Sequence, residues 1–118
     1  MESRGMQVLV VDAHSAARTD LHRVLEELGC LVLCANDARA AQAVLTGASS
    51  PIDVAVVDYG LAGRDLIREL RERDRTIRIV VTVAEDFMGS VPEGNLALRR
   101  PISTGDLAQI VIALRERL

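Results

Sequence analysis

Four short runs of apolar, mostly β-branched residues recur along the chain, and each is too short for a helix of useful length. They occupy residues 8–11, 31–35, 52–57 and 77–81. A run that is apolar at almost every position, without alternation, is typical of a strand that is buried on both faces of a sheet. The runs therefore predict a parallel sheet that is covered by helices on both sides.

Helical patterns separate the apolar runs, as crossover connections between parallel strands require. Ser15 is expected to cap the first helix, which Gly29 ends, and Asn36 or Asp37 to cap a second helix over about residues 38–45. The apolar face of the first helix is expected to comprise Ala17, Leu21, Val24, Leu25 and Leu28. The third helix, which should end near Arg73, has the apolar residues Leu66, Ile67 and Leu70. The apolar face of the last helix comprises Leu107, Ile110, Val111 and Leu114.

The last helix has the clearest start, because Ser103 to Asp106 resembles a capping box. A weak fifth strand is expected just before it, over residues 96–98. The segment between the fourth and fifth strands breaks the pattern, since it contains Gly89, Pro92 and Gly94. Any helix in that segment should be a turn or two at most.

Composition limits the kind of protein that this chain can be. Its 118 residues have the size of one domain, and 49% of them are hydrophobic, which is enough for a proper core. A net charge of -3 and an aromatic content of 2% disfavour nucleic acid as a partner. All 14 basic residues are arginines, so functions that need a lysine, such as Schiff-base catalysis or phosphate binding by a P-loop, are excluded.

The opening residues and the cysteines give further expectations. Residues 1–6 are short and polar, with no apolar stretch behind them that could be a signal peptide or a membrane span, so the sequence predicts a cytoplasmic protein without membrane contact. Cys30 and Cys34 lie four positions apart in the extended segment 29–34, which places them about 13 Å from each other. They are expected to be two buried free thiols.

Polar side chains close the predicted strands. Asp12, Asp58, Thr82 and Arg100 follow or end four of them. In an open α/β sheet, ligands bind beyond the carboxyl ends of the strands. Two carboxylates, a hydroxyl and a cation at one edge could hold Mg²⁺, offer one carboxylate as a nucleophile and stabilise the oxygens of a transferred phosphoryl group. Each residue could instead be an ordinary polar residue at the end of a strand.

Four motifs together resemble the receiver domains of response regulators in bacterial two-component systems. They are Val8-Leu9-Val10-Val11-Asp12, Asp53-Val54-Ala55-Val56-Val57-Asp58, Val80-Val81-Thr82 and Arg100-Pro101-Ile102. The resemblance covers nearly the whole chain and implies a single domain over residues 1–118. It also implies a flavodoxin-like (CheY-like), doubly wound sheet of five parallel strands in the order 2-1-3-4-5, with a short or irregular fourth helix. The implied chemistry is phosphoryl transfer to an aspartate from a sensor histidine kinase or a phosphotransfer protein.

The resemblance assigns a role to each matching residue. Asp58 matches the phosphoryl acceptor, and Asp12 matches an acidic ligand of Mg²⁺, the implied cofactor. Gly60 would offer its backbone carbonyl to the metal, and Thr82 matches the switch hydroxyl that binds the phosphoryl group. Arg100 stands where the family has a lysine before a proline that is often cis. The chemistry of the chain itself would be limited to self-phosphorylation and self-dephosphorylation.

Several positions depart from the family pattern. Ala13 replaces the second acidic residue, so Mg²⁺ should bind more weakly. Arg100 keeps the positive charge of the family lysine but carries it on a planar guanidinium group instead of an ammonium group. Ala97 stands at the position of the switch aromatic, and the segment from Gly60 to Asp65 lacks the usual Pro-Gly-x-Asp-Gly run.

Three functions remain open on the sequence alone. In the first, a working receiver with a relaxed metal site is phosphorylated on Asp58 and acts on an effector domain or a protein partner. In the second, a pseudo-receiver serves as an interaction or homodimerisation module without phosphorylation. In the third, Asp12-Ala13-His14 begins a cobalamin-binding pattern in which His14 would ligate cobalt, although Ala17 replaces the glycine of that pattern.

Overall fold

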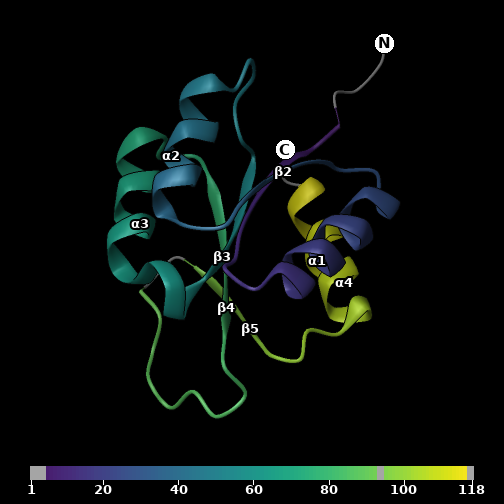
Figure 1. Ribbon diagram of the computed structural model, residues 1–118. Helices are drawn as coiled ribbons and strands as arrows, with labels where there is room; N and C mark the ends of the chain where they lie inside the picture. The colour runs from purple at the N-terminus through teal and green to yellow at the C-terminus, as the bar shows by residue number, and fades with distance from the viewer. Residues whose placement is uncertain (1–4, 93–94, 117–118) are drawn as a thin grey trace.

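The computed structural model describes residues 5–92 and 95–116, which form one sheet between two pairs of helices (Figure 1). The elements in chain order are β1 (Gln7–Val11), α1 (Ser15–Glu27), β2 (Leu31–Ala35), α2 (Ala38–Gly47), β3 (Val54–Asp58), α3 (Tyr59–Arg73), β4 (Arg78–Val83), β5 (Leu96–Arg99) and α4 (Thr104–Arg115).

The five strands are all parallel and lie in the order β2-β1-β3-β4-β5, which confirms the predicted topology. β1 and β3 are buried at every position, as their unbroken apolar sequences predict. In the register of β3 and β4, Asp58 lies opposite Thr82. The sheet therefore brings two predicted site residues to the same edge.

Each face of the sheet packs against one pair of helices. Figure 1 shows α1 and α4 on one side and α2 and α3 on the other. On the first side, Val10, Val56 and Val80 pack with apolar residues of α1 and α4, such as Leu25 and Val111. The opposite side has a similar layer from the sheet, α2 and α3. The site at the strand ends therefore rests on a core that is packed on both faces.

The ends of three helices test the predicted caps. Gly29 follows α1 with a φ of 88°, a left-handed conformation that favours glycine. Asp37 accepts a hydrogen bond from the backbone N–H of Ala40, and Ser103 accepts one from Asp106, so these two caps are confirmed. The prediction for Ser15 is wrong, because Ser15 is the first residue of α1 and His14 occupies the cap position without a capping side-chain bond.

The start of α3 lies earlier than Leu66, the first residue that the sequence analysis assigned to the third helix. The helix begins at Tyr59, directly after β3. Asp58 caps it by accepting a hydrogen bond from the backbone N–H of Gly60 at 3.2 Å. Asp58 is therefore the last residue of β3, the N-cap of α3 and a residue of the candidate site.

The connection from β4 to β5 contains no helix in its described residues 84–92 and 95, in agreement with its glycines and proline. Side-chain contacts organise it instead. Phe87 packs edge-on against Tyr59, with ring centroids 5.7 Å apart. Arg99 Nη1 donates to the carbonyl oxygens of Glu85 at 2.9 Å and Phe87 at 2.8 Å. These contacts hold the connection beside the start of α3.

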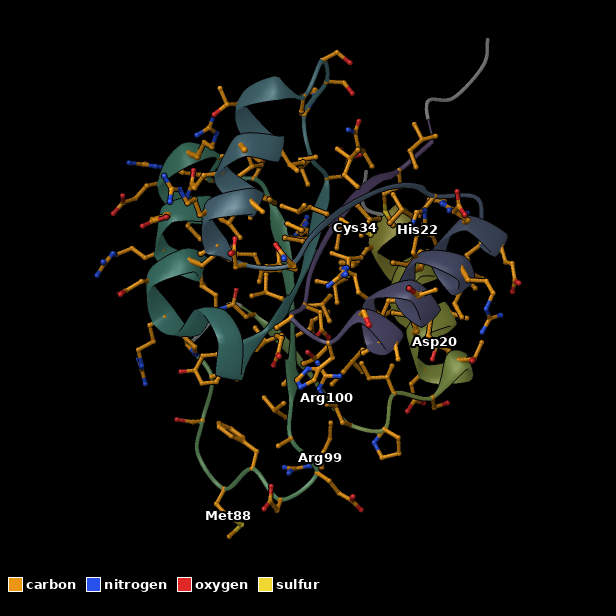
Figure 2. All side chains as sticks on the ribbon, in the orientation of Figure 1. Asp20, His22, Cys34, Met88, Arg99 and Arg100 are labelled. Atoms are coloured by element: carbon orange, nitrogen blue, oxygen red, sulfur yellow. The ribbon has the colours of Figure 1, made fainter. Side chains whose placement is uncertain are left out.

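Both cysteines are free, as expected, but their environments differ. Cys30 is buried and lies just before β2, and burial raises the pKa of its thiol. Cys34 in β2 is only half-buried, which corrects the expectation of two buried thiols, and its Sγ lies 3.6 Å from His22 Nδ1. Figure 2 shows His22 and Cys34 near each other, where α1 covers β2. Across the described ranges, no helix has the length and apolar character needed to cross a membrane.

Candidate functional site

The four residues that the sequence singled out meet at one edge of the sheet. Asp12 follows β1, Asp58 ends β3, Thr82 lies in β4 and Arg100 follows β5. Figure 2 shows Arg100 at the lower edge of the sheet, between the two helix pairs. Hydrogen bonds and ion pairs link these side chains, so the prediction that they converge is confirmed by their geometry.

Arg100 lies at the centre of these contacts. Its Nη2 donates to Asp12 Oδ2 at 2.6 Å and to Thr82 Oγ1 at 3.1 Å. The same nitrogen lies 3.7 Å from Asp58 Oδ2, which makes a looser ion pair. The peptide bond from Arg100 to Pro101 is cis. The guanidinium therefore reaches both carboxylates and the threonine hydroxyl from the position where the resemblance expects a lysine.

His14 also belongs to the site, which the sequence analysis did not predict for a receiver. Its backbone N–H donates to Asp12 Oδ1 at 2.9 Å, and its ring Nδ1 lies 3.1 Å from the same oxygen. Nδ1 also lies 3.9 Å from Asp58 Oδ2. The side chain is 74% exposed, so the imidazole borders the site from the solvent side.

Asp58 faces a hollow of about 420 Å³ at the end of the sheet. The hollow is lined by Ala13, His14, Asp58, Tyr59, Gly60, Val83, Ala84, Phe87 and Arg100. Asp58 Oδ1 accepts the hydrogen bond from Gly60, whereas Oδ2 lies beyond hydrogen-bond distance of both Arg100 and His14. The helix therefore fixes one carboxylate oxygen of Asp58, and the other makes only looser contacts with Arg100 and His14.

Asp12 is almost fully buried, with 1% of its surface exposed. Burial by itself would raise the pKa of its carboxyl group, because it penalises the charged form. Arg100 and the backbone N–H of His14 oppose this effect by binding the carboxylate, and together they lower the pKa below its ordinary value of 3.8. Asp12 is therefore a stable anion at neutral pH.

The lowered pKa of Asp12 predicts a contribution to stability that depends on pH. A carboxyl group whose pKa is lower in the folded state stabilises the fold above its unfolded pKa and loses this effect as the pH falls through the folded value. We expect the free energy of unfolding to fall as the pH drops below 3.8. Urea denaturation in EDTA should show a weaker acid dependence for Asp12→Asn than for the wild type. Equal acid dependence of the two proteins would contradict the assignment.

The donor set fits a divalent cation. Asp12, His14 and Asp58 each offer a ligand atom, and these atoms all lie within 4.8 Å of one another. Ala13 contributes no carboxylate, as the sequence indicated. Gly60 lies in the first turn of α3 and binds Asp58 through its N–H; a role for its carbonyl oxygen stays a prediction. Two carboxylates and an imidazole are suitable ligands for a divalent ion.

Sequence reasoning missed two features around this site. The first is the place of His14 in the receiver site, because the sequence analysis considered this histidine only as a cobalt ligand in the cobalamin-binding pattern. The second is the pair of Tyr59 and Phe87, which lines the hollow and joins the start of α3 to the connection after β4. Tyr59 and Phe87 are the only phenylalanine, tyrosine or tryptophan residues in the sequence. They lie far apart along the chain, so the sequence alone did not predict their contact.

The chain is similar to known proteins in sequence and in fold. No protein-family model matches the chain. It is 39% identical over 115 residues, 95% of its length, to the sensory/regulatory protein RpfC of Xanthomonas campestris pv. campestris, of which it covers 16%. It is 37% identical over 86 residues, 68% of its length, to the transcriptional regulatory protein AruR of Pseudomonas aeruginosa, of which it covers 35%. The chain thus spans a minor part of these curated relatives.

Solved structures give the same fold. A response regulator receiver domain protein from Clostridium thermocellum matches with a TM-score of 0.84 and 23% identity, over 94% of each chain. The signal receiver domain of an HD domain-containing protein from Pseudomonas fluorescens matches with a TM-score of 0.84 and 19% identity, over 97% of each chain. Together with the curated matches, these findings identify the chain as a receiver domain of the response-regulator type.

Proposed function

We propose that this receiver domain accepts a phosphoryl group on Asp58 and relays the event to a partner or effector domain. The observation that carries the proposal is the environment of the Asp58 carboxylate. Its side chain is 11% exposed, its Oδ1 accepts a hydrogen bond from Gly60, and Asp58 lines a hollow that Arg100 also lines. A carboxylate in such a position can act as a nucleophile towards a phosphorus atom.

The surrounding side chains supply what phosphoryl transfer requires, namely positioning and neutralisation of charge. Arg100, 3.7 Å from Asp58 Oδ2, is placed to bind an oxygen of the transferred group. Thr82 Oγ1 already accepts a hydrogen bond from Arg100 and can turn to donate its proton to the same group. Mg²⁺ held by Asp12 and Asp58, with the Gly60 carbonyl as a further ligand, would neutralise negative charge during the transfer.

A route for the relay leads from Thr82 to the connection after β4. Movement of the Thr82 hydroxyl towards a phosphoryl group would disturb Val83 and Ala84, which line the same hollow. Arg99 and the Tyr59–Phe87 contact hold the next residues of that connection. We propose that a partner recognises the rearrangement of this connection. It would take the place of the rotamer change of the family's switch aromatic, whose position Ala97 occupies.

The expected phosphoryl donors are a sensor histidine kinase or a phosphotransfer protein. A groove of about 310 Å³ supports docking of such a donor beside the site. It lies between α1 and the segment that enters α4, and its lining includes Ala17, Leu21, Arg100, Pro101 and Leu107. The groove shares Arg100 with the acceptor site, so a protein that docks there would reach Asp58 from nearby.

A pseudo-receiver is the second candidate, and one observation favours it. Arg100 already binds Asp12 at 2.6 Å, and Ala13 leaves the metal site with one carboxylate fewer than the family pattern. A permanent internal cation could stabilise one conformation without phosphorylation. In that case the domain would act as an interaction or homodimerisation module.

Intact-mass spectrometry distinguishes these two functions. The protein is incubated with Mg²⁺ and acetyl phosphate, together with Asp58→Asn and the control Asp65→Asn, whose carboxylate is 79% exposed on α3. We expect one added phosphoryl group on the wild type and on the control, and none on Asp58→Asn. An unmodified wild type, alongside a competent receiver that is modified, would favour the pseudo-receiver.

A further inference from the structure

We propose that His14 is a metal ligand and that, with Asp12 and Asp58, it makes this receiver prefer a divalent transition-metal ion to Mg²⁺. The ions meant are those that accept imidazole nitrogen readily, such as Mn²⁺, Co²⁺ or Zn²⁺. The ion would bind at the candidate phosphoryl site, so the functional meaning of the inference rests on the proposed function. The binding itself does not require phosphorylation.

The distances around His14 suit such an ion. Nδ1 lies 3.1 Å from Asp12 Oδ1 and 3.9 Å from Asp58 Oδ2. Ligand atoms that share an ion at bond lengths of about 2.1 Å lie roughly 3–3.5 Å apart. The ion would replace the contact between the imidazole and Asp12. The three ligand atoms lie within 4.8 Å of one another, so Asp58 would move towards the other two ligands when the ion binds.

The backbone holds His14 beside the carboxylates. The His14 N–H donates to Asp12 Oδ1 at 2.9 Å, and the carbonyl oxygen of Asp12 accepts a hydrogen bond from Arg18 Nη1 at 2.8 Å. These bonds fix the turn between β1 and α1. The imidazole itself is 74% exposed and borders the hollow over Asp58, so an ion and its remaining water ligands can enter from solvent.

The charges around the site favour a nitrogen ligand over further oxygen ligands. Arg100 binds Asp12 Oδ2 and offsets one of the two carboxylate charges, while Ala13 supplies no third carboxylate. Mg²⁺ depends on hard oxygen ligands and gains little from imidazole. Transition-metal ions gain affinity from imidazole, and their affinity rises from Mn²⁺ through Co²⁺ in a site of mixed ligands. The loss of charge therefore weakens Mg²⁺ more than it weakens these ions.

The chain contains a natural control, because it has only two histidines. His22 lies 3.6 Å from Cys34 Sγ and 3.4 Å from Glu26 Oε2, so it is the obvious competing site for a transition metal. It comes from the middle of α1 rather than from the turn after β1. Matched alanine substitutions at His14 and His22 separate the two sites.

The test titrates the wild type, His14→Ala and His22→Ala with Co²⁺ and with Mg²⁺, without any phosphoryl donor, by calorimetry and by the visible absorption of Co²⁺. We expect the wild type to bind Co²⁺ more tightly than Mg²⁺. His14→Ala should weaken Co²⁺ binding by at least about tenfold and Mg²⁺ binding by less than about twofold. His22→Ala should leave the Co²⁺ affinity of the Asp58 site unchanged.

Two results would overturn the inference: equal Co²⁺ affinity in the wild type and His14→Ala, or Co²⁺ binding that disappears only in His22→Ala. A further variant, His14→Asp, should shift the preference towards Mg²⁺, and no shift would also contradict the role of His14. These outcomes are independent of phosphoryl transfer. A protein that binds Co²⁺ through His14 but never accepts a phosphoryl group would refute the proposed function alone.

Discussion

Arg100→Ala is expected to lower the free energy of unfolding by about 3–5 kcal/mol, because it leaves a buried carboxylate without its cation. Asp12 is 1% exposed, and its Oδ2 accepts a hydrogen bond from Arg100 at 2.6 Å. The arginine side chain itself is only 25% exposed, so solvent screens the pair weakly. Urea denaturation at neutral pH, followed by circular dichroism, measures the change.

A surface arginine provides the control for this prediction. Arg68 on α3 is 66% exposed and pairs with Asp65 and Glu72, which are exposed as well. Arg68→Ala should change the free energy of unfolding by about 0–1 kcal/mol. If Arg100→Ala destabilised the protein no more than Arg68→Ala does, the ion pair between Arg100 and Asp12 would not be a main support of the site.

Leu66→Ala is expected to have a comparable effect, about 2–5 kcal/mol, through loss of core packing. Leu66 is 1% exposed and lies in the layer between the sheet and helices α2 and α3. Its removal leaves a cavity beneath α3, the helix that Asp58 caps. The same denaturation experiment measures the loss.

The control for Leu66→Ala is Ile112→Ala on α4, since the side chain of Ile112 is 52% exposed. Both substitutions remove a large aliphatic side chain from a helix and leave alanine, which favours helix. We expect the Ile112 variant to stay close to wild-type stability. Similar destabilisation by the two variants would mean that burial of Leu66 does not anchor α3.

The sequence predicted the sheet and most of the site for one physical reason. A parallel strand that is buried on both faces has an unbroken apolar sequence, and its carboxyl end is marked by the first polar residue. Asp12, Asp58 and Thr82 could therefore be assigned to one edge of the sheet from the amino-acid pattern alone. Arg100 was assigned to the same site because it precedes Pro101 in a motif that resembles the family's.

The start of α3, the contact between Tyr59 and Phe87 and the place of His14 depend on contacts in the folded structure that a local sequence pattern does not reveal. Gly60 and Gly63 near the start of α3 lower helix propensity, so the sequence pattern marked this helix only from Leu66 onwards. The Asp58 side chain and its bond to the Gly60 N–H compensate for this. Tyr59 meets Phe87 only because β3 and β4 are neighbours, and His14 reaches Asp58 only because β1 lies beside β3.

The central claim is that Asp58 carries the phosphoryl group, and chemical trapping tests it most directly. Borohydride reduces an aspartyl phosphate to homoserine, whereas a phosphorylated histidine is not converted in this way. Protein treated with acetyl phosphate and a divalent cation is reduced, digested and sequenced by mass spectrometry. We predict homoserine at position 58 and at no other aspartate. An unreduced phosphoryl group on His14, or homoserine at another aspartate, would contradict the account.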